Sequence, residues 1–256
     1  FGRKRAIDQS SCNKDFSCVD AFCPAFVTVH GAKPKTGHGA LDASEPIADL
    51  PTPDEYPLDR GWCAIVNGVG GTGVITIGAV LGMAAHLEGK GVGIIDMAGL
   101  AQKGGAVHSH LRIARTPADV DCVHVAAGQA DFVLGGDLVV TGSGKVLATI
   151  RRGHTRCLVN TAETMPGDFT RSVDFSLPAQ SLKHAIQDAA GPDHTRFFDA
   201  TAAAVALFGE SIAANMLLLG MACQLGSLPV SPQAIEKAIE LNGEAAAMNL
   251  AAFRWG

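Results

Sequence analysis

Three cysteines near the amino terminus are the residues best suited to bind a metal. Cys12, Cys18 and Cys23 have the spacing C-x5-C-x4-C, and Pro24 follows the last of them, as a proline follows the last cysteine of bacterial ferredoxin motifs. Thiolates are soft ligands that suit iron–sulfur clusters or zinc. The spacing matches neither the standard ferredoxin motif nor a zinc ribbon. We expect these cysteines to bind a metal centre, with reduced structural thiols as the alternative.

A glycine-rich loop is the second candidate. Gly68, Gly70 and Gly73 satisfy G-x-G-x-x-G between a predicted strand and a predicted helix, where backbone amides can face an anion. Asp96 ends the next predicted strand, near where an acid would meet a ribose hydroxyl. The candidate binding residues of the loop are Gly68, Gly70, Gly71, Thr72 and Gly73. Dinucleotide binding and simple turn formation both remain open.

A second exposed glycine pair lies further along the chain. Gly104 and Gly105 are preceded by Lys103 and lead directly into a predicted strand. Bare backbone at two adjacent loops suits a large occupant, either a cofactor or a neighbouring subunit. Lys103 could bind a phosphate or a carboxylate, with a solvated surface lysine as the alternative. Asn215 stands in an apolar helical stretch and needs a polar partner if it is buried.

Two histidines follow the second glycine pair. His108 and His110 alternate on the predicted strand, so both rings lie on the same face. Because a histidine titrates near neutral pH, they could contact a substrate or relay a proton. Packing or a subunit interface is the favoured role.

The surrounding pattern predicts the elements that position these residues. Apolar runs alternate with helical segments, which indicates an α/β domain with a largely parallel sheet. The predicted strands are "WCAIVNG", "GVGIIDM", "AVHSHLRIA", "ADFVLGGD" and "TRCLVNT". Ser231 and Pro232 are the expected N-cap and first residue of a late helix. We therefore predict a Rossmann-like sheet with flanking helices and a helical C-terminal part.

The chain divides into three predicted parts. Residues 1–30 form a cysteine-containing segment, residues 31–60 form a proline-rich linker or arm, and residues 61–256 form the main domain. Because the sequence starts at Phe1, we expect it to be part of a longer polypeptide or a processed piece.

Composition excludes several classes of protein. The net charge of -5 and pI near 6.0 give no basic surface for nucleic acid. Residues 212–225 are the most apolar stretch but are too short to span a bilayer, so we expect no membrane partner. An odd number of cysteines without a secretory signal favours a cytoplasmic location. Four cysteines in apolar surroundings are expected to be buried: Cys63, Cys122, Cys157 and Cys223.

These motifs together resemble a known family. "GVGGTGV", "AQKGGAV" and the late "ANMLLLG" resemble the gamma domain of the 2-oxoacid:ferredoxin oxidoreductases. "QSSCNKDFSC" and "CPAFVTV" resemble the fused indolepyruvate ferredoxin oxidoreductases, and the resemblance covers nearly the whole chain. Lys103 stands where the family usually has an arginine, a change shared with the indolepyruvate branch.

The resemblance implies an enzyme that decarboxylates a 2-oxoacid, such as indolepyruvate or another aryl pyruvate, on thiamine diphosphate. The acyl group would pass to coenzyme A, and electrons would pass through a 4Fe-4S cluster to ferredoxin. Thiamine diphosphate and Mg²⁺ would bind in partner domains, because the sequence has no "GDG" followed by an "NN" signature. We expect an oligomer.

The same resemblance implies roles for the candidate residues. Cys12, Cys18 and Cys23 would supply cluster ligands, with the fourth ligand from outside the 1–30 segment. His30 and His38 are weaker substitutes for it. The two glycine loops and Lys103 would line a shared cofactor or domain interface, and Asn215 would hydrogen-bond the backbone of the first loop.

Two alternatives stay open. The first is an autonomous NAD-binding oxidoreductase that uses Gly68, Gly70, Gly73 and Asp96. The second is a non-catalytic docking module whose glycine loops contact only a partner.

Overall fold

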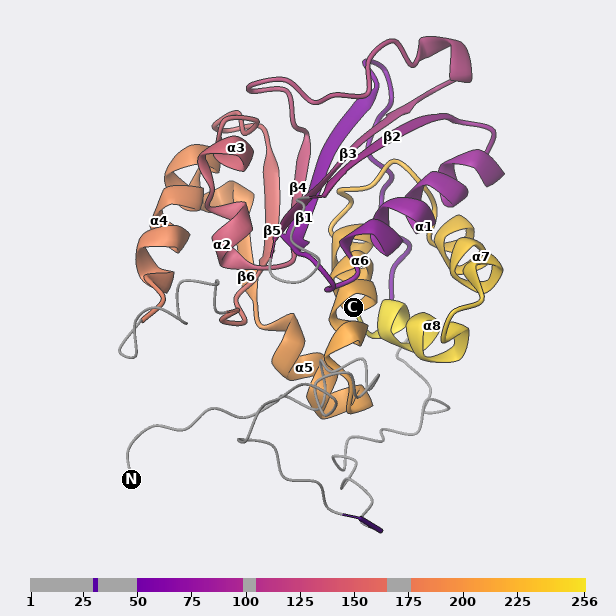
Figure 1. Cartoon of the computed structure of the whole chain (residues 1–256). Coiled ribbons are helices and arrows are strands. Elements are labelled where there is room, and N and C mark those ends of the chain that lie inside the picture. Colours follow the sequence, from indigo (N-terminus) through magenta and orange to yellow (C-terminus); the bar gives the residue numbers. More distant parts are fainter. Residues whose placement is uncertain (1–29, 32–49, 99–104, 165–175) are drawn as a thin grey trace.

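The fold is built on one six-stranded mixed sheet (Figure 1). The computed structural model describes residues 30–31, 50–98, 105–164 and 176–256. The strand order is β2-β3-β1-β4-β5-β6. The strands are β1 (Trp62–Val69), β2 (Gly91–Ala98), β3 (Ala106–Ala114), β4 (Phe132–Gly135), β5 (Arg156–Asn160) and β6 (Thr195–Phe198). The sheet and its flanking helices confirm the predicted α/β class.

Strand direction shows one departure from a fully parallel sheet. β1, β4, β5 and β6 run parallel, whereas β3 pairs antiparallel with both β1 and β2. Only residues 99–105 connect β2 to β3, and a parallel crossover needs a dozen or more residues. The short connection therefore forces an antiparallel hairpin, and β3 lies between β1 and β2.

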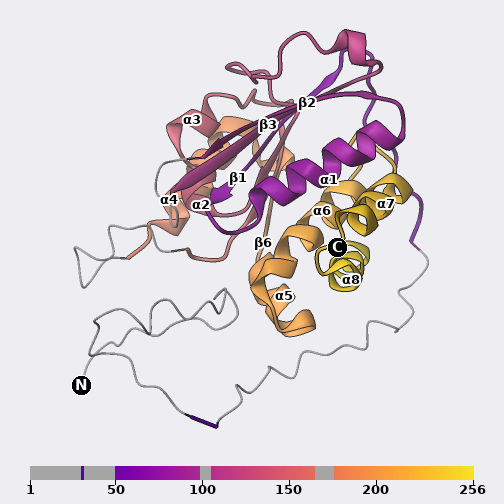
Figure 2. The ribbon, with the colours of Figure 1, turned by 45° about the vertical axis from the view of Figure 1, so that its right-hand side comes forward.

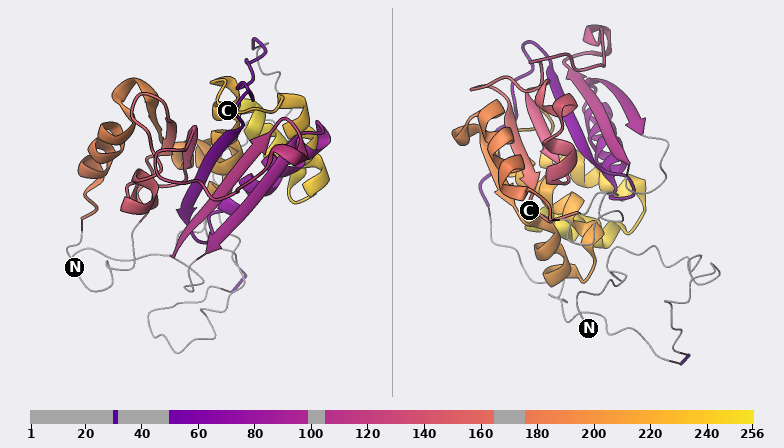
Figure 3. Two further views of the ribbon diagram at one scale, coloured as in Figure 1. Left: turned by 90° about the horizontal axis from the view of Figure 1, so that it is seen from above. Right: turned by 60° about the vertical axis from the view of Figure 1, so that its left-hand side comes forward.

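Two helical layers cover the sheet (Figures 1 and 2). One core cluster joins the sheet to α1, α6 and α7, and a second joins the opposite face to α2, α3 and α4. The view from above in Figure 3 shows the sheet between these layers. The helices are α1 (Val74–Leu87), α2 (Leu138–Thr141), α3 (Gly144–Leu147), α4 (Ala179–Ala190), α5 (Ala200–Phe208), α6 (Ala214–Gln224), α7 (Pro232–Asn242) and α8 (Ala246–Trp255). The described residues also contain the short 3-10 helices η1 (Pro117–Asp119), η3 (Pro192–His194) and η4 (Ser211–Ala213).

Most local predictions are confirmed. Ser231 caps α7, since its side chain accepts a hydrogen bond from the amide of Ala234, and Pro232 is the first helical residue. β6 and α8 were not predicted. β6 is short and only partly buried, so its apolar signal is weak. α8 is rich in alanine, which carries little hydrophobic periodicity.

One expectation about the cysteines is wrong. Cys63, Cys157 and Cys223 are buried as expected, but Cys122 is exposed. Cys122 lies in the irregular segment between η1 and β4, where its Sγ approaches the carbonyl of His124. Its apolar sequence neighbours therefore do not place it in the core.

The described part of the predicted 31–60 arm contacts the domain. The amide of Tyr56 donates to the carbonyl of Leu228 at 2.8 Å, and Tyr56 and Leu58 pack against the larger core cluster. Lys90 pairs with Glu55 at 3.0 Å. Among the described residues, no helix is long and apolar enough to cross a membrane.

Candidate functional site

The glycine loop begins where the buried central strand ends. β1 is buried along nearly its whole length, and Val69 is its last residue. Gly71 and Gly73 then adopt positive φ angles of 90° and 84°, which residues with a Cβ rarely adopt. α1 starts directly afterwards at Val74. Two glycines are thus required to turn the chain from a buried strand into the helix.

Three contacts hold this loop in place. The amide of Gly70 donates to the carbonyl of Gly105 at 2.7 Å, so the two glycine-bearing loops touch. The Thr72 hydroxyl donates to the carbonyl of Val69 at 2.6 Å. Asn215, on α6, donates from Nδ2 to the carbonyl of Thr72, which is the hydrogen bond expected for this asparagine. Segments far apart in the sequence therefore fix one loop conformation.

Asp137 is a further anchor that the sequence analysis missed. One carboxylate oxygen accepts from the amide of Val69 and the other from the amide of Val140, both at 2.8 Å. Burial raises the pKa of Asp137, while these backbone hydrogen bonds oppose that rise. A signal was present in "LGGD", where an acid follows two glycines at the end of a strand. Asp137 joins the carboxyl ends of β1 and β4.

The loop lies at a topological switch point, where the strands that follow β1 lie on both sides of it in the sheet. From β1 the chain continues to β2 on one side, whereas β4, β5 and β6 extend to the other. Crevices at such switch points are the usual ligand sites of open α/β sheets. The candidate site is therefore the carboxyl end of β1 beside β4.

The chemistry available at this loop is anion binding beside an apolar surface. The amides of Gly71 and Gly73 have no acceptor within the described residues, and they precede the positive end of the α1 dipole. No acidic residue occupies the first turn of α1. Ile75 and Ile212 are exposed beside the loop, at 48% and 43%. Phosphate oxygens and an apolar group could bind side by side here.

The described residues contain only some of the candidate site residues. Gly68, Gly70, Gly71, Thr72, Gly73, Gly105 and Asn215 come together around the start of α1. Lys103 and Gly104 lie outside the described residues, as do Cys12, Cys18, Cys23 and His38. No group of three potential metal ligands occurs within the described ranges.

Asp96 is poorly placed for the dinucleotide alternative. β3 separates β2 from β1, so Asp96 lies two strands, or about 10 Å, from the strand that carries the loop. Its carboxylate also accepts a hydrogen bond from Ser109. A ribose-binding acid normally ends the strand adjacent to the glycine-loop strand. The arrangement counts against an NAD site at this loop.

Of the histidine pair on β3, His110 has the packing role that was favoured. His110 is 5% exposed, its Nδ1 accepts from the amide of Val125 at 3.0 Å, and its ring stacks on His124. Burial, with smaller contributions from His124 and His108, lowers the pKa of His110 to about 4. Burial, followed by the charge of Lys145, lowers the pKa of His108. Both rings favour the neutral state.

Comparison with known proteins identifies the family. The model of the family "Pyruvate ferredoxin/flavodoxin oxidoreductase" matches residues 63–256. The chain belongs to this family. A relative from Methanothermobacter thermautotrophicus, named indolepyruvate oxidoreductase subunit IorB, is 27% identical over 198 residues, covering 75% of this chain and 93% of that protein.

Two solved structures share the fold. The gamma subunit of a keto/oxoacid ferredoxin oxidoreductase from Geobacter sulfurreducens has a TM-score of 0.52 and 23% identity, covering 76% of this chain and 95% of that one. A 2-oxoglutarate:ferredoxin oxidoreductase from Magnetococcus marinus, solved with 2-oxoglutarate, coenzyme A and succinyl-CoA bound, has a TM-score of 0.53 and 18% identity. That match covers 76% of this chain and 30% of the other. The family predicted from the sequence motifs is confirmed.

The buried histidine predicts a pH-dependent stability. Because the folded-state pKa of His110 is about 4, below its unfolded value of about 6.5, the unfolded chain binds more protons between these values. The free energy of unfolding should therefore fall as pH decreases from 6.5 to 4, by up to about 3 kcal/mol from this residue. Urea unfolding across this range measures the slope.

The variant His110→Gln keeps an acceptor for the amide of Val125 and removes the titration, so its slope should be shallower. His86→Gln, at an exposed position of α1, serves as the control and should retain the original slope. An unchanged slope in His110→Gln would contradict the attribution of the pH dependence to His110.

Proposed function

We propose that this chain is the gamma component of an oxidoreductase that oxidatively decarboxylates an aryl 2-oxoacid such as indolepyruvate. Family membership and the anchored glycine loop at the switch point carry the proposal. The relative named as an indolepyruvate oxidoreductase subunit supports the substrate class. Lys103 in place of the usual family arginine favours the same branch.

The glycine loops are proposed to form part of a coenzyme A site. Coenzyme A carries several phosphate groups and an adenine ring, which suit free backbone amides beside exposed isoleucines. The contact between Gly70 and Gly105 joins the first loop to the segment that follows Lys103 and Gly104. The Magnetococcus marinus enzyme of the same fold was solved with coenzyme A bound, which supports this ligand.

The residues of this chain would bind and orient coenzyme A. The open space beside Gly71 leaves room for its phosphates, and the amides of Gly71 and Gly73 donate to them. Lys103 adds a positive charge, and Asn215 fixes the loop by bonding Thr72. Thiamine diphosphate, held with Mg²⁺ in partner domains, would supply the decarboxylation chemistry.

The cysteine segment is proposed to ligate a 4Fe-4S cluster. Cys12, Cys18 and Cys23 supply three of the four thiolates that such a cluster needs, and another segment or chain supplies the fourth. The cluster would pass electrons to ferredoxin. The complete enzyme is proposed to be a cytoplasmic oligomer.

Substitution in the loop should weaken coenzyme A binding selectively. A Cβ at Gly70 would lie 3.3 Å from the carbonyl of Gly105, so Gly70→Val displaces one loop from the other. We expect the KM for coenzyme A of the assembled enzyme to rise about tenfold, with little change in the KM for the 2-oxoacid. Lys103→Ala, which introduces no crowding, should also raise the KM for coenzyme A.

Gly144→Val is the matched control, because a Cβ at Gly144, in α3 on the other face of the sheet, meets nothing within 4 Å. Unchanged coenzyme A kinetics in both loop variants would favour the docking module. Nicotinamide binding that Asp96→Ala abolishes would revive the dinucleotide alternative.

The cysteine assignment predicts a loss of iron. In protein purified anaerobically, replacing Cys12, Cys18 and Cys23 together by serine should remove about four iron atoms per chain and the associated absorbance. Cys122→Ser removes an exposed free thiol and should leave the iron content unchanged. Equal iron content in the triple variant and the parent would refute the cluster ligands.

A further inference from the structure

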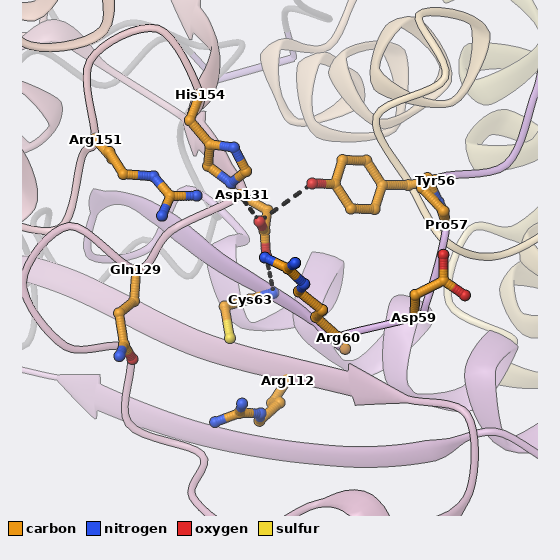
Figure 4. A pocket seen from close by; sticks show the side chains of 11 residues that line it. Tyr56, Pro57, Asp59, Arg60, Cys63, Arg112, Gln129, Asp131, Arg151 and His154 are labelled. Carbon is orange, nitrogen blue, oxygen red and sulfur yellow. Dashed lines mark hydrogen bonds and ion pairs between the residues drawn. The ribbon is translucent and has the colours of Figure 1, made fainter.

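A cavity of about 420 Å³ lies at the amino ends of β1 and β4, opposite the glycine loop (Figure 4). Its walls come from several separate segments. Tyr56 and Arg60 belong to the stretch before β1, and Arg112 belongs to β3. Gln129 lies before β4, and Arg151 lies before β5. The cavity is therefore separate from the proposed coenzyme A site.

One of the two carboxylates that line the cavity, Asp131, already has neutral partners and a histidine. Its Oδ2 accepts from the amide of Cys63 at 2.8 Å, and its Oδ1 accepts from the hydroxyl of Tyr56 at 3.2 Å. His154 Nε2 lies 2.7 Å from the same Oδ1. These contacts, drawn in Figure 4, fix Asp131 in the wall without an arginine partner.

Three guanidinium groups line the same cavity with unused donors. Arg60 and Arg151 form no side-chain hydrogen bond or ion pair with any described residue. Arg112 donates from Nη1 to the carbonyl of Cys122 at 2.9 Å, but its buried Nε has no partner there. The other acid of the lining, Asp59, forms an exposed ion pair with Arg115, which does not line the cavity, at 3.1 Å.

The charges therefore leave the cavity positive. Burial raises the pKa of the Cys63 thiol, so this sulfur stays neutral and adds no compensating charge. Arginine stays protonated at any physiological pH, and three nearby guanidinium groups repel one another unless an anion lies between them. The arrangement suits an anion supplied from outside the chain.

We propose that this cavity binds the phosphate group of a small molecule. Its donors surround the space from several segments, as Figure 4 shows, rather than forming one planar fork. A tetrahedral phosphate presents oxygens in all these directions, whereas a carboxylate is planar and is matched by a single guanidinium. The Tyr56 ring and Pro57 supply an apolar wall for the rest of the molecule.

The test is equilibrium dialysis of the full-length protein, in its native complex, against radiolabelled inorganic phosphate at constant ionic strength. The parent should bind one more phosphate per chain than the variant Arg60→Gln/Arg151→Gln, or bind it at least tenfold more tightly. Both arginines are exposed, so the variant should keep its fold, and an unchanged thermal midpoint verifies this.

Arg152→Gln is the matched control. Arg152 adjoins Arg151 and carries the same charge, but it lies outside the cavity and donates to the carbonyl of Asp188. It should bind phosphate like the parent. Equal binding by the parent and the double variant would overturn the proposal, as would equal losses in the double variant and Arg152→Gln. Tighter competition by succinate than by glycerol phosphate would overturn the assignment to phosphate.

Discussion

The carboxylate of Asp137 joins the carboxyl ends of β1 and β4, and the position of the glycine loop depends on it. The amide of Val69 ends the buried strand and would lose its partner without this acceptor. A buried donor left unpaired costs about 1–3 kcal/mol, so the interaction fixes the strand end. Asp137 also starts α2 through the amide of Val140, so one side chain organises both sides of the switch point.

The hairpin of β2 and β3 determines what can lie beside that loop. Because β3 returns next to β1, the carbonyl of Gly105 reaches the amide of Gly70, and the two glycine loops become one surface. The same insertion moves Asp96 away from the loop. The position of β3 thus favours a phosphate-rich ligand that lies across both loops. It disfavours a dinucleotide bound as in a fully parallel sheet.

The features that the sequence predicted correctly depend on residues close together in the chain. The apolar run of β1, the glycines before α1 and the Ser231 cap each involve neighbours within a few residues. Asp137 contacts Val69, and Asp131 in the arginine-lined cavity contacts Cys63, each across 68 positions, so spacing alone does not reveal either feature. Asn215 was an exception, because a polar side chain in an apolar helix indicates a missing partner. The β2–β3 hairpin was not predicted, although the seven residues between the two strands are too few for a parallel crossover.

Amide hydrogen exchange of the assembled enzyme, with and without coenzyme A, tests the proposed role of the glycine loop most directly. The free amides of Gly71 and Gly73 are the donors that would contact the phosphates, so saturating coenzyme A should slow amide exchange across residues 70–75. Residues of α4, on the opposite face of the sheet, should exchange at the same rate in both states. Unchanged exchange across residues 70–75 with coenzyme A bound would contradict the role assigned to this loop.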